Sequence, residues 1–391
     1  MKKLAIGLLQ GFRRAGLAWR RLRGIGEEEH HARRIVSGQS WEEFCDTLKS
    51  AGAAMTFPGA PQDPFNQAEG YRYLSRLARA GLEAFVEFAD PRAPVLMRVV
   101  HETVKMGSDN PDNYYQNAAV HGDYQYRVYG TRGTVNYLGF GTQTGHYGQG
   151  GGMPPVGYIE ASELEIGPDG RFELLLSVEP QDGNWLPIAP GPGTLIVRQT
   201  FGDRAAETRA ELVIERVGGD GLPSPVTAKA IDEGLNSAST LVAGAALLFA
   251  KWSRDFQKHV NELPRFSQAV SDAAGGDPNI AYYHSYWQLG PEEVLEITAT
   301  PPDCESWNFQ LDNHWMESLD YRYHRIHLNK QTAHYEPDGS LRILVSHVDP
   351  GHPNWIETVG HDRGAMSFRW IRAQAHPQPA TRVLKLAEIQ P

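Results

Sequence analysis

The sequence predicts a mainly β fold with helical additions: two repeated antiparallel β-sandwich or jelly-roll units, N-terminal helices and a long central helix. One observation behind this is an internal duplication, since PDGRFELLLSVEPQDGNWL at 168–186 returns as PDGSLRILVSHVDPGHPNWI at 337–356. A second is that the hydrophobic pattern changes from helical before residue 110 to alternating after Asp123. Two copies are too few for an open repeat array, so a pair of packed sandwiches is the simpler interpretation.

The two copies match at ordered positions, with an offset that drifts only from 169 to 171 residues. The matched positions are Asp169-Gly170 with Asp338-Gly339, Asn184-Trp185 with Asn354-Trp355, and Arg198 with Arg369. We expect them to superpose, with both tryptophans plugging the sandwich ends and both asparagines bonding local backbone. Each arginine is either a buried, paired residue or a clamp for a carboxylate. One residue is inserted in the second copy near His347, which suggests a β-bulge.

Composition narrows the class of protein. The chain has 391 residues and a formal net charge of −10, which argues against nucleic acid or anionic membrane as the main partner. Its two cysteines, Cys45 and Cys304, cannot form a disulfide framework, so a cytoplasmic setting is the default expectation. The apolar run at 4–9 is too short for a signal peptide. The basic N-terminus fits an amphipathic helix that packs on the surface, in an oligomer or on a membrane.

The pattern divides the chain into four segments: helical 1–118, a first β unit at 119–218, a helical insertion at 219–290 and a second β unit at 291–391. Ser40 and Glu43 are spaced as a capping box, and a second helix is expected over 68–89. A helix over 224–263, capped by Ser224, would be about 60 Å long. It is expected to break near a glycine or to bridge the β units.

Turn residues place the strands of both units. Strands are expected at 158–166 and 171–179, joined as a hairpin through Asp169-Gly170, and Asp338-Gly339 repeats that turn. In the second unit strands are expected near 293–300, 305–312, 323–335, 341–348 and 364–373. The glycine-rich segment GQGGGMPP lacks the lysine of a phosphate-binding loop and is expected to be a connector or lid.

No standard catalytic signature is present, but nine of the fifteen histidines lie after residue 280. Imidazole, carboxylate and phenol groups concentrated in one unit are typical of an acid/base or metal site. The segment 313–327 has no counterpart in the first copy, so the functional pocket is expected in the second unit. The candidate catalytic residues are His314, Glu317, Asp320, Tyr321 and His347. A metal site is the weaker alternative, because no His-x-His pair occurs.

Four separated motifs carry a family resemblance: AEGYRYLSRLARAGLEAFVEFADP, NWLPIAPGPGTLIVRQTF, NHWMESLDYRYHRIHLN and DPGHPNWIETVGH. Together they resemble the proteins grouped as domain-of-unknown-function family 1214, from about residue 40 to 373. The resemblance implies jelly-roll-like β-sandwich domains with helical additions. It implies no reaction and carries no catalytic residues over.

The first functional hypothesis is an enzyme acting on a hydrophobic or amphiphilic small molecule such as a steroid, terpenoid or aromatic. It would be a lyase, isomerase or hydrolase without an organic cofactor or a metal, with its pocket between the helical segment and the second unit. The candidate substrate-binding residues are Tyr114, Tyr115, Tyr283, Trp287, Trp315 and Arg369. The alternatives are a double β-sandwich that binds carbohydrate or lipid without catalysis, and a scaffold that forms homo-oligomers.

Overall fold

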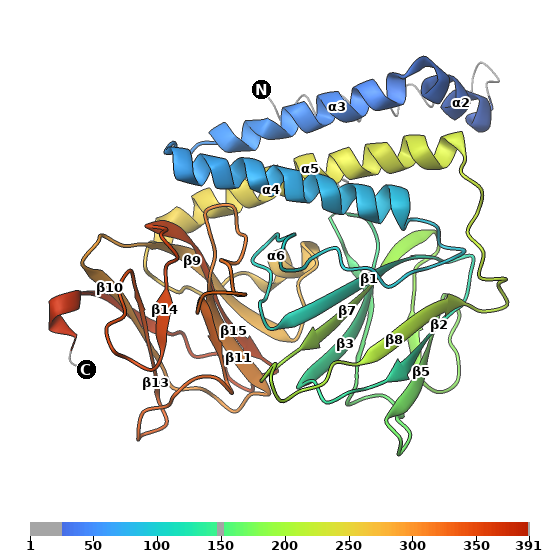
Figure 1. Ribbon diagram of the computed structural model, residues 1–391. Helices are drawn as coiled ribbons and strands as arrows, with labels where there is room; N and C mark the ends of the chain where they lie inside the picture. The colour runs from blue at the N-terminus through green and yellow to red at the C-terminus, as the bar shows by residue number, and fades with distance from the viewer. Residues whose placement is uncertain (1–25, 147–151, 390–391) are drawn as a thin grey trace.

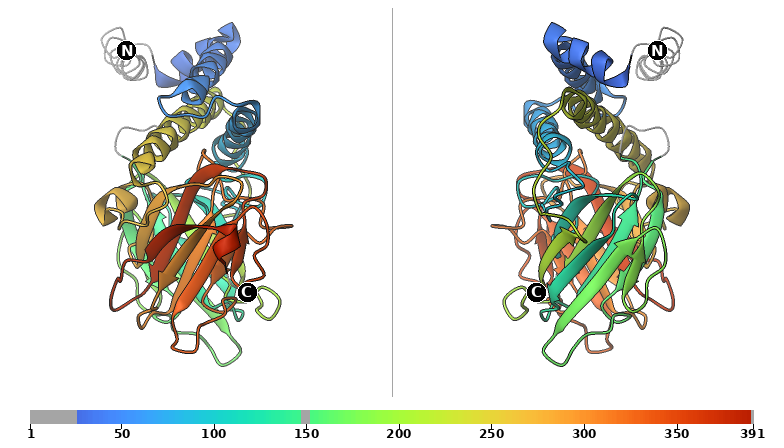
Figure 2. Two further views of the ribbon diagram at one scale, coloured as in Figure 1. Left: turned by 90° about the vertical axis from the view of Figure 1, so that its left-hand side faces the viewer. Right: turned by 90° about the vertical axis from the view of Figure 1, so that its right-hand side faces the viewer.

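The protein is built as a layer of helices over two β-sandwiches that stand side by side. The computed structural model describes residues 26–146 and 152–389. Figure 1 shows the long helices lying across both sandwiches, and the end views in Figure 2 show them on one side only. The expected N-terminal amphipathic helix and the first half of the glycine-rich segment GQGGGMPP lie outside the described residues. The predicted fold class is confirmed.

The N-terminal helices begin and end at signals that differ from those expected. They are α2 (Glu27–Ser37), α3 (Gln39–Ala51), η1 (Gly52–Thr56), α4 (Pro64–Leu82) and the π turn η2 (Glu83–Glu87). The capping box was wrong, because Gly38 is the N-cap of α3. The Ser40 hydroxyl instead donates to Asp232 at 2.7 Å, and Glu43 binds Arg34. The sequence pattern could not show that a buried carboxylate on another helix competes for this serine.

The central helix α5 (Ala228–Phe256) is continuous and bridges the two units (Figure 1). Thr227, not Ser224, caps it by accepting a hydrogen bond from the Ala230 N–H at 3.1 Å. Its buried face is rich in alanine, which lets α4 come close: a Cβ added to Gly81 would lie 2.9 Å from the Ala238 carbonyl oxygen. Short helical segments η3 (Gln257–His259) and α6 (Gln268–Ala273) lead into the second unit.

Each unit holds two four-stranded sheets, and the strand orders of the two units correspond one to one. The orders β1-β7-β3-β4 and β6-β5-β2-β8 in the first unit match β9-β15-β11-β12 and β14-β13-β10-β16 in the second. The first unit contains β1 (Asn113–His121), β2 (Tyr126–Thr131), β3 (Tyr137–Gln143), β4 (Pro155–Glu160), β5 (Arg171–Ser177), β6 (Trp185–Pro187), β7 (Pro192–Thr200) and β8 (Glu211–Arg216). The second contains β9 (Ile280–Gln288), β10 (Glu293–Ala299), β11 (Ser306–Leu311), β12 (His327–Asn329), β13 (Leu341–Ser346), β14 (Trp355–Glu357), β15 (Arg363–Ile371) and β16 (Ala380–Lys385), followed by η4 (Leu386–Glu388). The units therefore begin at β1 and β9, earlier than the expected boundaries at 119 and 291.

The expected hairpin at Asp169-Gly170 is wrong in its pairing. Strand β4 pairs with β3, whereas β5 pairs with β2 and β6, so this turn connects the two sheets of one sandwich. Gly170 and Gly339 both adopt positive φ, 77° and 81°, as such a turn requires. The expected strand at 323–335 shortens to β12, and the residue inserted near His347 lies in the loop after β13 rather than in a bulge.

The asparagines of the repeated Asn-Trp pair make equivalent hydrogen bonds to the backbone in both units. The Asn184 side chain binds both backbone groups of Glu165 and the Glu173 carbonyl, as Asn354 binds those of His334 and the Arg342 carbonyl. Both asparagines thus bond local backbone, as expected. Trp185 and Trp355 are only half-buried, so the plug interpretation is wrong. The fully buried neighbours are Leu186 and Ile356.

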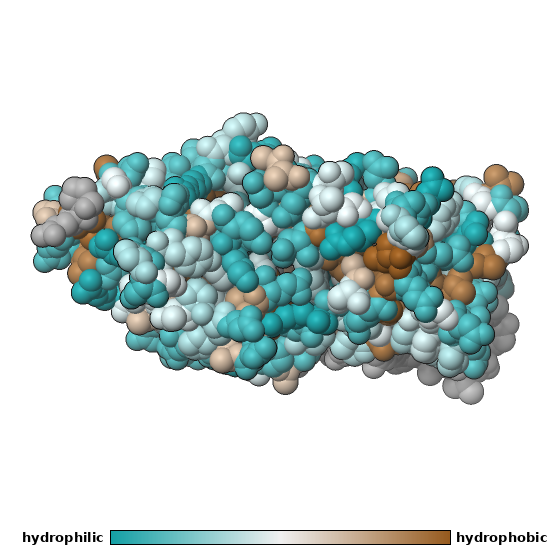
Figure 3. Space-filling model, turned by 90° about the horizontal axis from the view of Figure 1, so that it is seen from below, coloured by the Kyte–Doolittle hydropathy of each residue, from teal (hydrophilic) through white to brown (hydrophobic). Residues whose placement is uncertain are grey.

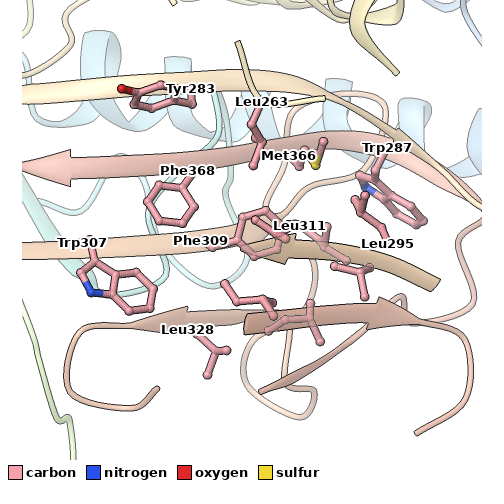
Figure 4. Packing of buried hydrophobic residues seen from close by; sticks show 14 of the residues in the cluster. Leu263, Tyr283, Trp287, Leu295, Trp307, Phe309, Leu311, Leu328, Met366 and Phe368 are labelled. Carbon is pink, nitrogen blue, oxygen red and sulfur yellow. The ribbon is translucent and has the colours of Figure 1, made fainter. Parts of the chain in front are cut away.

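Three apolar cores support this architecture: one inside each sandwich and one beneath the helices. The second sandwich is filled with aromatic residues, among them Trp307, Phe309 and Phe368 (Figure 4). Tyr283 and Trp287, expected to bind substrate, are both fully buried in this core. Only the Tyr283 hydroxyl reaches out, donating to the His376 carbonyl at 2.7 Å.

The outer surface offers no broad apolar face on the side opposite the helices. Figure 3 shows that side as mostly hydrophilic, with apolar residues in small separate groups. Among the described residues no helix is long and apolar enough to cross a membrane.

Candidate functional site

Two candidate sites contain polar residues that the fold brings together from distant segments of the chain. The first, the edge groove, lies where the ends of α4 and α5 meet the second unit. The second, the inter-unit interface, lies between the two sandwiches, where the loops 107–112 and 274–279 precede β1 and β9.

The edge groove is an open hollow of about 720 Å³ with a mainly apolar lining. Its lining residues are Val260, Gln288, Leu289, Gly290, Pro291, Glu293, His347, Val348, Gly360, His361 and Asp362. A smaller hollow of about 230 Å³ adjoins it through Val260 and Gln288 and includes Tyr286 and Arg363. Of the residues expected to line a pocket, only His347 lines the larger hollow.

Two histidines in the groove wall are joined through Thr358. The Thr358 hydroxyl lies 2.8 Å from Nδ1 of His347, and the Thr358 carbonyl lies 3.1 Å from Nδ1 of His361. Nε2 of His347 reaches the Leu289 carbonyl at only 3.3 Å, longer than an ordinary hydrogen bond. His347 is therefore held firmly on one side of its ring and loosely on the other.

A chain of buried ionisable groups lies behind His361. Its Nε2 is 2.7 Å from the Glu69 carboxylate, which also accepts from the Asn313 side chain at 3.1 Å. Asn313 bonds Glu317 as well, and Arg76 completes the chain by pairing with Glu317 at 2.6 Å. Burial would raise the pKa of Glu69, but the His361 hydrogen bond and charge lower it. Burial and the neighbouring Glu69 raise the pKa of Glu317. The hydrogen-bonded chain therefore contains one carboxyl with a lowered pKa, Glu69, and one with a raised pKa, Glu317.

His314 lies one layer beneath the smaller hollow. Its Nδ1 is 2.9 Å from the Tyr286 hydroxyl, and Ser253 donates to its carbonyl at 2.6 Å. Burial, followed by the charge of Arg363, lowers the pKa of His314 to about 3, so this imidazole is neutral at physiological pH. His314 can accept from Tyr286 but has no direct access to the groove.

The inter-unit interface is pseudo-symmetric, because each unit's leading loop is bound by the other unit. Arg198 of the first unit donates to the Gly275 carbonyl at 2.8 Å, and Arg369 of the second donates to the Ser108 carbonyl at 2.5 Å. In the same way Asn329 binds Asp112 at 2.9 Å, and Asn279 lies 3.4 Å from Glu160. The duplicated units are thus joined by exchanged polar contacts.

Around Arg369 the interface is saturated with hydrogen bonds. Its Nη1 donates to Asn308 at 3.1 Å and to Gln310 at 2.5 Å, and these residues lie on β11 beside it. Only 3% of Arg369 is exposed. Arg369 is therefore a buried, paired arginine, the first of the two alternatives that the sequence left open, and not a clamp for a carboxylate.

Around Arg198 the positions on β3 that correspond to Asn308 and Gln310 carry no amide side chains. Strand pairing places Gly139 opposite Arg198, as Asn308 lies opposite Arg369, and two residues on Gly141 replaces Gln310. Arg198 is only 8% exposed, yet among the described residues its guanidinium makes one hydrogen bond, to Gly275. Tyr115 stands beside it on β1, and the charge of Asp277 acts on it most strongly among its neighbours.

Buried acids surround Arg369 as well. The Asp109 carboxylate accepts from the Ser318 N–H and hydroxyl at 3.0 and 2.8 Å, and Lys105 donates to the carbonyls of Ser318 and Leu319. Burial raises the pKa of Asp312 to about 7; the Gln310 hydrogen bond at 2.6 Å opposes this rise, and the charge of Asp109 adds to it. Asp312 therefore titrates near neutral pH inside the protein.

The remaining sequence candidates are spread over several places. Asp320 is half-buried and pairs with Arg322 at 2.7 Å, while the Tyr321 ring lies 4.6 Å from the Lys105 ammonium. Trp315 is buried under α4, where its indole N–H donates to the Asn66 carbonyl. Tyr114 accepts from Arg209 on the first unit. Of the eleven candidates, His347 lines the groove, His314 and Glu317 lie behind it, and Tyr115 and Arg369 meet at the interface.

His361 and Glu69 were not predicted as site residues, and Arg198 was expected only as one of two possible carboxylate clamps. Arg198 carried a usable signal, because extending the repeat alignment upstream sets Asn110-Pro111 on Asp277-Pro278 and Tyr115 on Tyr282. The same alignment sets glycines of β3 on amides of β11. Glu69 and His361 carried no such signal, because a helix and a loop 292 residues apart meet only in the folded chain.

A metal site is not favoured by the described residues. Two groups of potential ligands share His31, one with His30 and Asp232 and one with Glu27 and Glu233. The Asp232 carboxylate is already bound by His31 at 2.7 Å and by Arg34 at 3.1 Å, so it ties α2 to α5. This cluster stabilises the helical layer.

Fold and interface define a duplicated double-sandwich protein with a helical cover. The family model described as protein of unknown function (DUF1214) matches residues 291–375, so this part of the chain, most of the second β unit, is similar to that family. An uncharacterised protein from Burkholderia cenocepacia has a similar crystal structure, with 48% sequence identity over 92% of this chain and 100% of that chain, and a TM-score of 0.90. A Vibrio parahaemolyticus protein shares 11% identity over 81% of this chain and 98% of its own, with a TM-score of 0.46. No protein of curated function matches the chain.

Proposed function

We propose that the chain is an enzyme that binds an amphiphilic small molecule in the edge groove and acts on it by acid/base chemistry. The observation that carries this proposal is the setting of His347. Its ring lines the groove, Thr358 fixes Nδ1 at 2.8 Å, and Nε2 has only a long contact at 3.3 Å. A proton-transfer group needs this combination of a fixed ring and a reachable nitrogen.

The groove's lining suits a ligand that is apolar over most of its surface. Val260, Leu289, Pro291 and Val348 supply apolar contact, and His347 and Glu293 supply polar ends. In the tautomer whose Nδ1 accepts from the Thr358 hydroxyl, Nε2 carries the ring proton and can donate it to a ligand oxygen. The class of substrate remains that expected from the sequence: a steroid, terpenoid or aromatic.

The test compares ligand binding with turnover in one protein. A thermal-shift screen of steroids, terpenoids and aromatics identifies a ligand, and product formation is then followed for the wild type and His347→Ala. We expect His347→Ala to lose at least about 100-fold in turnover while it still binds the ligand.

His334→Ala is the matched control, because this histidine is exposed in the same unit and lines neither hollow. It should keep wild-type turnover. Binding by both variants with no turnover in the wild type would favour the non-catalytic binding module. An effect of His334→Ala equal to that of His347→Ala would contradict the role of His347.

A further inference from the structure

A second, separate site is indicated by the difference between the two equivalent arginines. Arg369 has its partners built in as Asn308 and Gln310, while the residues equivalent to those amides beside Arg198 are Gly139 and Gly141. Among the described residues no acceptor pairs with the remaining donors of this guanidinium, and none of its nitrogens is a fully buried atom without a partner, so solvent reaches them. A ligand that replaces this water must supply acceptors, because an unpaired buried donor is costly.

The space beside Arg198 differs between the two glycines. A Cβ added to Gly139 would lie 2.4 Å from the Tyr158 hydroxyl, so that position is filled by tyrosine. A Cβ added to Gly141 would meet Ile196 at 3.4 Å, Tyr158 at 3.5 Å and Nη1 of Arg198 at 3.8 Å, all ordinary contacts. Room therefore remains next to Gly141, in contact with the free edge of the guanidinium.

Two further donors face this region. The hydroxyls of Tyr115 and Tyr282 each accept a backbone N–H, from Asn110 at 3.1 Å and Asp277 at 3.2 Å. Neither hydroxyl donates to any described residue. Both rings keep partial exposure, although they stand between the two sandwiches. The Tyr115 and Tyr282 hydroxyls therefore each have a donor hydrogen that no acceptor among the described residues uses.

The nearby acid does not fill this role. The Asp277 carboxylate accepts from the hydroxyls of Tyr137 and Tyr158 at 3.1 and 3.0 Å. Its charge acts on Arg198, but among the described residues no carboxylate lies within ion-pair distance of that guanidinium. Asp277 holds the tyrosines in place and leaves the edge of Arg198 open.

We propose that Arg198 binds the carboxylate of a small organic acid, with the Tyr115 and Tyr282 hydroxyls as additional donors. The planar fork of an arginine matches the two oxygens of a carboxylate. Ile196 and the Tyr158 ring, beside Gly141, form the apolar wall against which the organic part packs. No residue of this site lines the edge groove, so the proposal stands independently of the catalytic role of His347.

The experiment uses the full chain and a pair of probes that differ mainly in charge, benzoate and neutral benzamide. Isothermal titration of the wild type should give benzoate an affinity at least about 10-fold above that of benzamide. Equal affinity for both probes, or no benzoate binding at millimolar concentration, would overturn the proposal.

The decisive variant is Gly141→Gln, which installs the amide that the second unit already has. It should satisfy Arg198, leave thermal stability unchanged or raised, and weaken benzoate binding at least about 10-fold. Gly52→Gln is the matched control, since a Cβ there meets nothing within 4 Å and binding should be unchanged. Should Gly141→Gln not fold, Arg198→Lys provides the same test, because lysine keeps the charge but loses the fork. Wild-type affinity in the variant used would overturn the proposal.

Discussion

The two β units have the same strands in the same order, yet they use one equivalent arginine in different ways. In the second unit Asn308 and Gln310 saturate Arg369, and the result is a closed, fully bonded interface. In the first unit two glycines stand at those positions, and Arg198 makes one hydrogen bond to the part of the chain that the structure describes. Duplication supplied two copies of a buried cation, and the residues on the adjacent strand made one copy structural and left the other available.

This comparison adds a second place to the one expected from the sequence. The segment 313–327 is unique to the second unit, which suggested that all functional asymmetry would lie there. The structure shows that a smaller difference, amide against glycine, opens space in the first unit. An added segment is easy to see in an alignment of repeats. A glycine that stands where the other repeat has a side chain is as informative, but it is easily overlooked.

The largest expected effect comes from removing each arginine in turn. Arg369→Met leaves two amides, the Ser108 carbonyl and the nearby buried acids without their partner, so we expect a loss of about 3–5 kcal/mol in unfolding free energy. Arg198→Met removes one hydrogen bond and should cost about 1–2 kcal/mol. Urea unfolding of both variants measures the difference. Equal losses would show that the two arginines are bonded alike.

A smaller effect is expected from the repeated asparagines. Asn354 is fully buried, whereas Asn184 is half-buried, although each makes three equivalent bonds to backbone. Asn354→Ala should therefore cost about 3 kcal/mol and Asn184→Ala about 1–2 kcal/mol, because water can reach the groups orphaned in the first unit. Chemical denaturation at one pH is sufficient. A greater loss in Asn184→Ala would contradict the correspondence in burial.

The pH dependence of stability sharpens the comparison next, because Asp312 replaces Gln143 at the equivalent position. The pKa of Asp312 is raised to about 7, so the folded state holds a proton that the unfolded state releases at lower pH. Its contribution is present below about pH 4 and is lost as pH rises through 7. Asp312→Asn should be more stable than the wild type above pH 7 by about 1 kcal/mol or more, with little difference at pH 4.

Urea midpoints measured from pH 4 to pH 8 would test this, with Gln143→Asn as the uncharged control in the first unit. The control should shift stability by a similar amount at every pH. A wild type and an Asp312→Asn variant with parallel pH profiles would show that Asp312 does not titrate in this range.

The sequence predicted the strands well because their evidence is local. Alternation, turn glycines and the Pro-Asp-Gly repeat all act within a few residues, and they recur in both copies in order. The pairing of β4 and β5 was mispredicted for the same reason. A glycine turn fixes the local reversal of the chain but not which sheet each strand joins.

The site residues were harder because their partners are distant. His347 was found as an inserted residue, but its partner Thr358 and the groove itself depend on a loop and on the ends of two helices. Ser40 was mispredicted for a related reason. Its spacing to Glu43 fits a helix cap, but its hydroxyl donates to the buried Asp232 on another helix instead. Local rules fail where a buried charge from another element competes.

The smallest expected effect is at Asp320, a catalytic candidate in the segment that the first unit lacks. The structure pairs it with Arg322 at 2.7 Å, and both side chains are about one third exposed, at 35% and 36%. The Arg322 hydrogen bonds lower the pKa of Asp320 to about 2, against the effect of burial. Its stabilisation is therefore present above about pH 4 and is lost only as pH falls toward 2.

Water screens a pair this exposed, so Asp320→Asn should cost less than about 1 kcal/mol at pH 7 and nothing further at pH 2. Because Asp320 lines neither hollow of the edge groove, ligand binding there should not change. Arg322→Gln should match it in both measurements. If Asp320→Asn abolished turnover while Arg322→Gln did not, the carboxylate would act on the ligand directly, and the reactive part of the site would extend from the groove to this loop.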